Sequence, residues 1–279
     1  MKLSGRTKIA GLFGYPVEHT LSPAMHNAAF EALGLDYCYV AFPVHPDSLQ
    51  EAVKAIRALH LSGVNVTIPH KERVIPFLDE VDKEASAIKA VNTIVNSDGN
   101  LKGYNTDGRG FMQSFFDYGI SAEGKDVLIV GAGGASRAIS YYLGKEAKKL
   151  FLYDIEQEKA EWLAADLKKI LNKDIFVVDD IARTERFNIL INATPLGLKE
   201  EDPLPFGTSH LRADQIVCDL IYKKTRLLEE ASRKGCIALD GLGMLLWQGV
   251  FAFELWTGVS PPVDIMREAL YKSLNRDGW

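Results

Sequence analysis

Short apolar runs alternate with helical patterns along the whole chain, which predicts strands alternating with helices. In the first series, Ser22 followed by Pro23 predicts a helix that begins with Ser22 as its N-cap and ends at Gly34. Two apolar stretches on either side of 97–100 predict a hairpin. The predicted strands are 9–13, 37–42, 63–67, 91–96 and 101–104, and the predicted helices are 22–33, 46–59, 77–81 and 83–89.

A second series of strands and helices begins near Lys125, and the boundary between the two series lies near 106–110. Because strands that alternate with helices form parallel sheets covered on both faces, we expect an α/β fold. The last two helices, 244–257 and 263–275, have no strand after them, so they can pack back on the first domain. The other predicted elements are strands at 127–130, 150–153, 175–178, 188–192, 216–219 and 236–239, and helices at 135–146, 156–171 and 225–234.

The composition is that of an ordinary globular protein. Of the 279 residues, 47% are hydrophobic and 25% are charged, which excludes extensive disorder. No apolar run approaches the roughly 20 residues that cross a bilayer, and the N-terminal residues lack the apolar core of a signal peptide. The formal net charge of −5 creates no general attraction for nucleic acid or an anionic membrane, so we expect neither as a partner.

The cysteines and histidines give no sign of a disulfide framework or a metal centre. Cys38, Cys218 and Cys236 are scattered and form no CxxC pair, so the expected location is the reducing cytoplasm. No two histidines form an HxxxH pair, so no metal is expected. No strand or stripe identifies an oligomer interface, and we expect a monomer or a homodimer.

A glycine-rich segment, GAGGAS at 131–136, follows an apolar strand and opens a helix. This is the context that a dinucleotide-binding turn requires. Gly131 allows the tight turn, Gly133 lets backbone N–H groups approach a pyrophosphate, and the helix N-terminus adds partial positive charge. Ser136 stands where a third glycine is usual. The alternative is a glycine-rich turn that binds no ligand.

Asp154 favours the dinucleotide interpretation. It ends the next predicted strand, at about the 20-residue spacing from Gly131 at which an acidic residue accepts hydrogen bonds from the adenosine ribose. Asp154 could instead be a helix N-cap. The segment 154–158 carries three carboxylates before the first cation, Lys159, whereas a 2′-phosphate favours a nearby arginine. We therefore predict NAD in preference to NADP.

Polar residues in the first domain occur where apolar strands end, and sites in α/β proteins lie at such positions. Hydroxyls, amides, one lysine and one carboxylate suit a small polyol that bears a carboxylate. Each has a structural alternative: helix caps for Ser22 and Asp107, sheet-end hydrogen bonds for Thr67 and Asn92, and a solvated side chain for Lys71. The residues concerned are Thr20, Ser22, Asn65, Thr67, Lys71, Asn92, Asn105, Thr106 and Asp107.

Seven motifs, taken together and in order, resemble those of the shikimate dehydrogenases over nearly the whole chain. An ordered set with matching spacing is far more specific than any single motif. The motifs are GYPVEHTLSP at 14–23, NVTIPHK at 65–71, AVNT at 90–93, GYNTDG at 103–108, GAGGASR at 131–137, NATPLG at 192–197 and DGLGML at 240–245.

The resemblance implies reversible, nicotinamide-dependent reduction of 3-dehydroshikimate to shikimate, with Lys71 and Asp107 as the catalytic pair. An ammonium beside the developing alkoxide stabilises it, and a neighbouring carboxylate orients the lysine. The substrate-binding residues implied are Thr20, Ser22, Thr67, Asn92, Asp107, Tyr222 and Gln248. The cofactor-binding residues implied are Gly131, Ala132, Gly133, Gly134, Ala135, Asp154, Thr194, Leu220 and Gly241.

The motifs divide the chain into two domains with an active site expected in the cleft between them. An N-terminal α/β substrate domain comprises 1–107 and is completed by the helices within 244–279. A Rossmann-type, doubly wound dinucleotide-binding domain comprises 108–243.

Three departures from the family pattern bear on specificity. Thr20 stands where serine is common, Asp154 stands where members that use NADP commonly have an Asn-Arg-Thr cluster, and the loop at 223–225 is short. The second and third of these departures, with LLWQG at 245–249, partly resemble the quinate/shikimate branch. A quinate-preferring dehydrogenase is therefore one alternative. Another is a dinucleotide-binding regulatory protein without catalysis, although such a protein needs no lysine–carboxylate pair.

Overall fold

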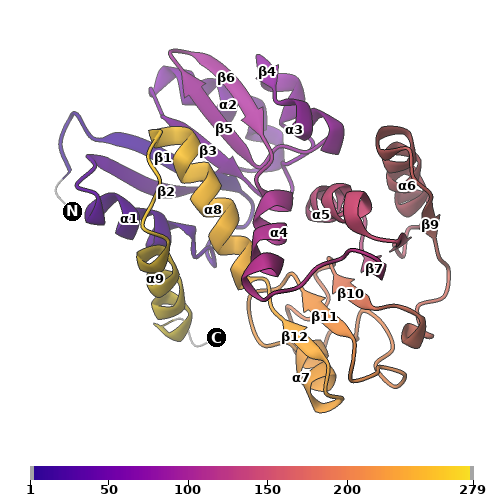
Figure 1. Ribbon diagram of the computed structural model, residues 1–279. Helices are drawn as coiled ribbons and strands as arrows, with labels where there is room; N and C mark the ends of the chain where they lie inside the picture. The colour runs from indigo at the N-terminus through magenta and orange to yellow at the C-terminus, as the bar shows by residue number, and fades with distance from the viewer. Residues whose placement is uncertain (1–2, 277–279) are drawn as a thin grey trace. The chain divides into compact units, whose positions relative to one another are not determined.

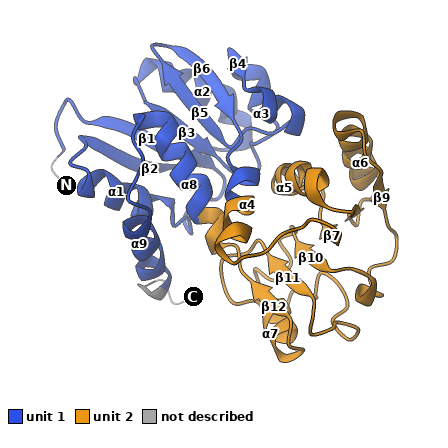
Figure 2. Ribbon diagram, viewed as in Figure 1, with its two compact units in different colours: residues 1–110, 246–279 blue, residues 111–245 orange. Residues whose placement is uncertain are grey.

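The computed structural model describes residues 3–276 and contains two six-stranded sheets with helices, which confirms the predicted α/β class. Contacts within the chain divide it into two compact units (Figure 2). Unit 1 contains residues 1–110 and 246–279, and unit 2 contains residues 111–245. Each unit has its own sheet, so each is described in turn.

The sheet of unit 1 combines parallel and antiparallel strands (Figure 1). Its strand order is β2-β1-β3-β5-β6-β4, with β1 parallel to both of its neighbours. β5 runs antiparallel to β3 and β6, and the β5–β6 pair is the predicted hairpin. The strands are β1 (Lys8–Gly14), β2 (Tyr37–Pro43), β3 (Gly63–Val66), β4 (Glu80–Val81), β5 (Thr93–Ser97) and β6 (Asn100–Tyr104).

Side chains alternate between the two faces of this sheet, and each face meets different helices. On one face, Val64 and Val66 belong to the same apolar cluster as Val53 and Ile56 of α2. On the other face lie α1 and α8, and α8 runs along the sheet in Figure 1. The helices that pack in unit 1 are α1 (Ser22–Ala32), α2 (Leu49–Ala58), α3 (Lys83–Ile88), α8 (Leu242–Thr257) and α9 (Val263–Arg276).

His26 lies in an aromatic layer between α1, α8 and the sheet. Its ring stacks on Tyr39 with 4.4 Å between ring centroids and lies parallel to Phe253 at 6.3 Å. Neither ring nitrogen has a hydrogen-bond partner within residues 3–276. Complete burial lowers the pKa of His26 to about 3, so the ring is neutral at neutral pH. His26 therefore packs as an aromatic side chain.

Two local predictions in unit 1 are wrong. Ser22 is the first residue of α1 and not its N-cap, which is Leu21 and makes no side-chain capping bond. The predicted helix at 77–81 is absent, because Glu80–Val81 forms β4, which pairs in parallel with Lys102 and Gly103 of β6. This pairing joins segments that are far apart in sequence, so local periodicity does not reveal it.

The sheet of unit 2 is wholly parallel, with strand order β12-β11-β10-β7-β8-β9. Counted from β7, this is the order 6-5-4-1-2-3 of the Rossmann fold, with its switch point between β7 and β10. The strands of this sheet and the helices α5, α6 and α7 begin and end within one residue of their predicted positions. The elements are β7 (Asp126–Val130), β8 (Lys149–Tyr153), β9 (Ile175–Val177), β10 (Ile189–Asn192), β11 (Ile216–Asp219), β12 (Ile237–Leu239), α5 (Gly134–Glu146), α6 (Gln157–Leu171) and α7 (Arg226–Arg233).

Loops replace two of the helices that a doubly wound sheet usually carries. The connection from β9 to β10 contains only a 3₁₀ turn, Thr184–Arg186, and β10 connects to β11 through irregular chain. Phe187, Phe206 and Leu211 from these connections are buried against Leu128 and Val217 of the sheet. Apolar loop side chains thus cover this face in place of helices. Within the described residues, no helix is long and apolar enough to span a membrane.

Candidate active site

Lys71 and Asp107 form an ion pair in unit 1. Lys71 lies in the turn after β3, where its carbonyl accepts a hydrogen bond from the N–H of Val91 at 2.8 Å. Asp107 is the first residue of α4 (Asp107–Asp117), where the helix dipole favours a carboxylate. The Lys71 Nζ donates to Asp107 Oδ2 at 2.6 Å, and the two side chains are only 15% and 6% exposed. Limited contact with water strengthens the attraction within this pair.

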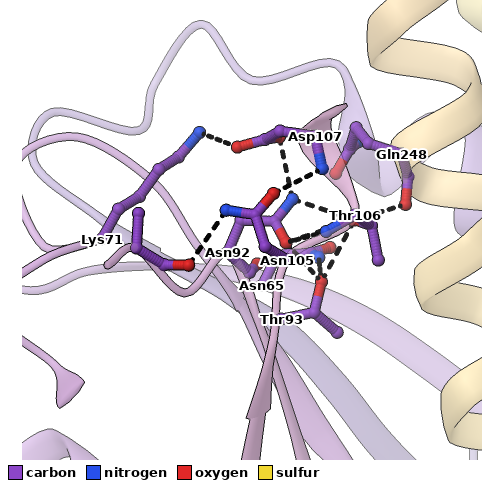
Figure 3. Close-up of polar contacts among 9 residues, drawn as sticks. Asn65, Lys71, Asn92, Thr93, Asn105, Thr106, Asp107 and Gln248 are labelled. Atoms are coloured by element: carbon purple, nitrogen blue, oxygen red, sulfur yellow. Dashed lines mark hydrogen bonds and ion pairs between the residues drawn. The ribbon is translucent and has the colours of Figure 1, made fainter. Parts of the chain in front are cut away.

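Asn92 engages the other oxygen of the Asp107 carboxylate (Figure 3). Its Nδ2 donates to Asp107 Oδ1 at 2.8 Å and to Thr106 Oγ1 at 2.9 Å. Its Oδ1 accepts from the Thr106 N–H at 2.8 Å. The Thr106 hydroxyl also donates to the backbone carbonyl of Gln248, which brings α8 into the network. Both carboxylate oxygens of Asp107 thus accept from side chains, which favours a site role over the alternative of a helix cap.

A second part of the network leads from Asn92 to β2. The Asn65 Nδ2 donates to the Asn92 carbonyl at 3.2 Å, and the Asn65 Oδ1 accepts from the Tyr39 hydroxyl at 2.8 Å. Elsewhere in unit 1, the Ser22 N–H donates to Thr20 Oγ1 at 3.3 Å. The hydrogen bonds of the sheet therefore connect Tyr39 with Asn92 through Asn65.

Tyr39 belongs to this network, although its position in the sequence does not predict it. Its position in an apolar strand is typical of a core aromatic residue, and its ring does stack on His26. Burial raises the pKa of the Tyr39 hydroxyl, so this group stays protonated and donates to Asn65. No local signal marks this role, because Asn65, the partner of the Tyr39 hydroxyl, lies on another strand.

Thr67 and Asn105 occupy the ends of the predicted strands in unit 1. Thr67 follows β3, and its N–H donates to the Phe13 carbonyl at 2.9 Å. A Cβ on Gly14 would lie 2.4 Å from the Thr67 methyl group, so only glycine allows this close approach. Asn105 accepts from the Asp107 N–H at 3.1 Å and thereby fixes the turn before α4.

The glycine-rich segment of unit 2 lies at the carboxyl end of β7, as predicted. Gly131 has φ of +106°, and a Cβ there would lie 2.8 Å from the Ala193 carbonyl oxygen, so the turn requires glycine. A Cβ at Gly133 would meet nothing within 4 Å, which leaves the space above the turn open. α5 begins at Gly134 with no side-chain cap and no acidic residue in its first turn. This helix N-terminus therefore fits the pyrophosphate of a dinucleotide.

Asp154 lies directly after β8 and faces the same turn. Its Oδ2 accepts from the Ala132 N–H at 2.8 Å, and its Oδ1 accepts from the Glu156 N–H at 2.9 Å. The alternative of a helix N-cap is wrong, since α6 begins at Gln157 and its N-cap is Glu156. Ser136, at the position of the third glycine, is fully buried in α5. A carboxylate thus stands beside the glycine-rich turn.

The other predicted cofactor residues of unit 2 follow neighbouring strands. Thr194 follows β10, Leu220 follows β11 and Gly241 follows β12. A Cβ on Gly241 would lie 2.2 Å from the Leu220 carbonyl oxygen, so these two backbones touch. Leu220 and Gly241 also line one cavity, together with Asp219 and Met244.

Tyr222, predicted to bind the substrate, belongs to unit 2 and lies in the loop after β11. Burial raises the pKa of its hydroxyl, so the phenol is protonated at neutral pH and can donate a hydrogen bond. Among residues 3–276, no group of three or more histidine, cysteine or acidic side chains is arranged to hold a metal ion.

The chain is similar in sequence to known proteins. Residues 12–94 match the shikimate dehydrogenase substrate binding domain, and residues 241–271 match the shikimate 5'-dehydrogenase C-terminal domain. A shikimate dehydrogenase (NADP(+)) from Desulforamulus reducens is 45% identical over 284 residues, covering 98% of each chain.

Solved structures resemble the chain over the same extent. A shikimate dehydrogenase in complex with NADP⁺ is 41% identical, with a TM-score of 0.91, and the match covers 98% of this chain and 97% of that chain. A shikimate 5-dehydrogenase from Listeria monocytogenes, in complex with shikimate and NAD, is 38% identical, with a TM-score of 0.88 and coverage of 97% and 98%. With identity of this level over nearly its full length, the chain belongs to the shikimate dehydrogenase family.

Proposed function

We propose that this protein transfers a hydride between a nicotinamide dinucleotide and the C3 position of shikimate, interconverting shikimate and 3-dehydroshikimate. The observation that carries the proposal is the largely buried ion pair of Lys71 and Asp107. Asn92 donates a hydrogen bond to the other oxygen of the Asp107 carboxylate. A protein that only binds a dinucleotide needs no such pair. Membership of the family supports the same reaction.

The ammonium group of Lys71 moves the proton in the proposed reaction. The nicotinamide, when bound, accepts the hydride in the oxidation direction and supplies it in the reduction direction. During reduction the Lys71 ammonium donates a proton to the C3 oxygen and becomes a neutral amine, and during oxidation the neutral amine takes that proton from the C3 hydroxyl. Asp107 orients Lys71 through the 2.6 Å hydrogen bond at its Oδ2.

The polar network of unit 1 supports binding of a polyhydroxylated carboxylate. We assign the substrate carboxylate to the hydroxyls of Thr20, Ser22 and Tyr222. We assign the ring hydroxyls to Thr67, Asn92, Asp107 and Gln248. Hydroxyl and amide groups supply both donors and acceptors, whereas Lys71 is the cation that favours an anionic substrate.

The glycine-rich turn and the loops after β10, β11 and β12 form the proposed cofactor site. The residues assigned to the cofactor are Gly131, Ala132, Gly133, Gly134, Ala135, Asp154, Thr194, Leu220 and Gly241.

Unit 1 is accordingly the proposed substrate domain, with 1–107 completed by helices of 244–279, and 108–243 is the proposed dinucleotide domain. The scattered cysteines support a cytoplasmic location. Light scattering distinguishes the monomer from the homodimer that the sequence allows.

We further propose a preference for NAD over NADP, although the Desulforamulus relative is named for NADP(+). The Asp154 carboxylate lies beside the glycine-rich turn, where the ribose of the adenosine half is expected. The nearby cation Lys159 is paired with Glu156 at 2.6 Å. A 2′-phosphate there would meet carboxylates in place of an arginine, so NADP is disfavoured.

One steady-state experiment tests the reaction and the cofactor together. The purified protein is assayed with shikimate and with quinate, each in the presence of NAD and of NADP. We expect the highest kcat/KM for shikimate with NAD. Absence of turnover in all four combinations contradicts the enzyme assignment, and a higher kcat/KM with NADP contradicts the role of Asp154. A higher kcat/KM for quinate identifies the quinate-preferring alternative.

Replacement of Asp154 tests the cofactor preference directly. Asp154→Asn keeps an oxygen that can accept from the Ala132 N–H but removes the charge. We expect the ratio of kcat/KM for NADP to that for NAD to rise about tenfold, on the scale of one charged hydrogen bond. Asp174→Asn removes an exposed carboxylate elsewhere in unit 2 and should leave the ratio unchanged. An equal ratio in the two variants contradicts the assignment.

A further inference from the structure

The loops that follow β10 and β11 are joined through one buried carboxylate, that of Asp219. Asp219 is the last residue of β11 and is 1% exposed. Its Oδ1 accepts from the Asn192 Nδ2 at 3.0 Å and from the Ile221 N–H at 3.1 Å. Its Oδ2 accepts from the Thr225 hydroxyl at 2.7 Å. Asp219 thus accepts from the neighbouring strand and from two positions of its own loop.

The network continues from Asn192 into the loop after β10. The Asn192 Oδ1 accepts from both the N–H and the hydroxyl of Thr194, at 3.0 and 2.6 Å. The Asn192 Nδ2 also donates to the Leu196 carbonyl at 3.0 Å. A continuous set of hydrogen bonds therefore connects Thr194 with Thr225 through Asn192 and Asp219. The two loops that it joins contain three of the residues assigned above to cofactor and substrate.

Hydrogen bonds from neutral groups, and not an ion pair, hold the Asp219 carboxylate in place. Its hydrogen-bond partners are an amide, a hydroxyl and a backbone N–H, all of them neutral. Burial raises the pKa of its carboxyl, and the nearby Asp240 carboxylate raises it further, whereas the three donors lower it. Burying a carboxylate without a neighbouring cation costs free energy. The need for two oxygens that accept from three donors offers a physical reason for a carboxylate at this position.

Asp219 also lies next to the backbone assigned to the cofactor. It lines the same cavity as Leu220, Gly241 and Met244. The Ile221 N–H that it accepts from follows Leu220 directly, and the Leu220 carbonyl touches Gly241. A change in the Asp219 side chain would therefore shift the peptide of Leu220 first.

We propose that Asp219 is a positioning residue for the nicotinamide half of the cofactor: it fixes the loops that carry Thr194 and Leu220. The inference rests on the proposed function, because it takes the loops after β10 and β11 as the nicotinamide side. Asp219 itself needs no contact with the cofactor. Its loss should weaken binding of the nicotinamide half and leave the adenosine half, at Gly131 and Asp154, unaffected.

Two cofactor ligands separate these halves. NADH contains the nicotinamide, and ADP-ribose lacks it but keeps the adenosine, both riboses and the pyrophosphate. Isothermal titration calorimetry of each ligand gives the ratio of their Kd values for every variant. In Asp219→Leu we expect the Kd for NADH to rise at least tenfold, and the Kd for ADP-ribose to stay within about twofold, since one buried hydrogen-bond network is broken near one half only.

Gln215 provides a matched control at the opposite end of the same strand. It precedes β11, is fully buried, and donates to the carbonyls of Thr184 and Phe187 while accepting from the Arg212 N–H. Gln215→Leu and Asp219→Leu should both lower the melting temperature, but Gln215→Leu should leave the ratio of the two Kd values unchanged. This comparison separates a positioning role from a loss of stability.

Two milder variants keep the test decisive if Asp219→Leu does not fold. Thr225→Val removes one donor to Asp219, and we expect at least a threefold rise in the Kd for NADH without a matching change for ADP-ribose. Asp219→Asn retains an oxygen for Asn192 and Ile221 and can donate to Thr225, so we expect it to restore NADH binding to within about threefold of the wild type.

The outcomes distinguish this inference from the proposed function. If the wild-type protein binds neither NADH nor ADP-ribose, the proposed function fails. If the wild type binds both, and Asp219→Leu or Thr225→Val weakens them by the same factor, the function stands and the positioning role is overturned. A ratio of Kd values that shifts as much in Gln215→Leu also overturns it.

Discussion

The two units each hold a buried carboxylate at the carboxyl end of their sheet, and the two carboxylates have different partners. In unit 1, Asp107 accepts from the ammonium of Lys71 and from Asn92. In unit 2, Asp219 accepts only from neutral groups. A carboxylate paired with an ammonium can support proton transfer to a substrate, whereas one surrounded by amide and hydroxyl donors organises backbone. The partner, and not the carboxylate, thus indicates which task each can perform.

Removal of the cation should have the largest effect. Lys71→Ala should lower kcat for shikimate oxidation by about 10²–10⁴, because it removes the proton-transfer group, while KM changes by less than about threefold. Steady-state kinetics with shikimate and NAD measures both. Lys102→Ala, which removes a more exposed lysine paired with Glu80, is the control and should retain full activity. A Lys71→Ala protein with normal kcat would show that the ion pair is only structural.

Removal of one hydroxyl in the unit 1 network should have an intermediate effect. Tyr39→Phe keeps the ring stacked on His26 but leaves the buried Asn65 oxygen without its donor. We expect stability to fall by about 1–3 kcal/mol and kcat/KM for shikimate to fall about tenfold, because Asn65 also supports Asn92. Urea unfolding and steady-state kinetics measure the two effects.

Tyr37 supplies the matched control for this change. It lies on the same strand, is buried and stacks on Phe30 with 5.0 Å between ring centroids. Tyr37→Phe removes a hydroxyl outside the network that leads to Asn92. Equal kinetic losses in Tyr37→Phe and Tyr39→Phe would mean that the network does not carry the effect.

The smallest effect should be a difference in how stability varies with pH. Burial raises the folded-state pKa of Asp219 above the roughly 3.9 of an unfolded chain. Its contribution to stability is therefore fully present below about pH 4 and is lost as the pH rises through the folded-state pKa. Asp219→Asn cannot titrate, so its stability relative to the wild type should increase with pH over this window, as measured by urea unfolding.

Asp214 provides a control of opposite sign in unit 2. Its exposed carboxyl has a pKa lowered by the Arg212 side chain, so its contribution to folding is present above about pH 4 and is lost as the pH falls through the folded-state pKa. Asp214→Asn should therefore lose stability relative to the wild type as the pH rises to about 4, with a constant difference above that pH. If Asp219→Asn follows the same direction as Asp214→Asn, the account of the buried carboxyl is wrong.

Local pattern was sufficient for most of the fold. In unit 2, the pattern of alternating strands and helices placed the strands of the sheet and the helices α5, α6 and α7 within one residue of their positions. In unit 1, the local pattern did not predict the two-residue strand at Glu80–Val81, because this strand is defined by its pairing with β6. Short strands bury too little surface to leave a periodic pattern, and their stability comes from distant partners.

The candidate site likewise contains residues that the sequence predicted and contacts that it did not. The glycine-rich turn, Asp154, Lys71 and Asp107 could be predicted because each lies at a strand end within a short motif. The motifs also drew attention to Asn92. The family resemblance implied the pairing of Lys71 with Asp107. The other hydrogen bonds could not be predicted, since the partners of one side chain come from several elements.

Spacing along the chain therefore specified which chemical groups stand at the strand ends, because backbone geometry repeats over a few residues. Folding assigned most of their other partners. It joined Tyr39 of β2 to Asn65 of β3, surrounded Asp219 with neutral donors and placed Asn92 against the Asp107 carboxylate. Such pairings depend on the register of strands far apart in sequence and on burial, and both arise only when the sheets form.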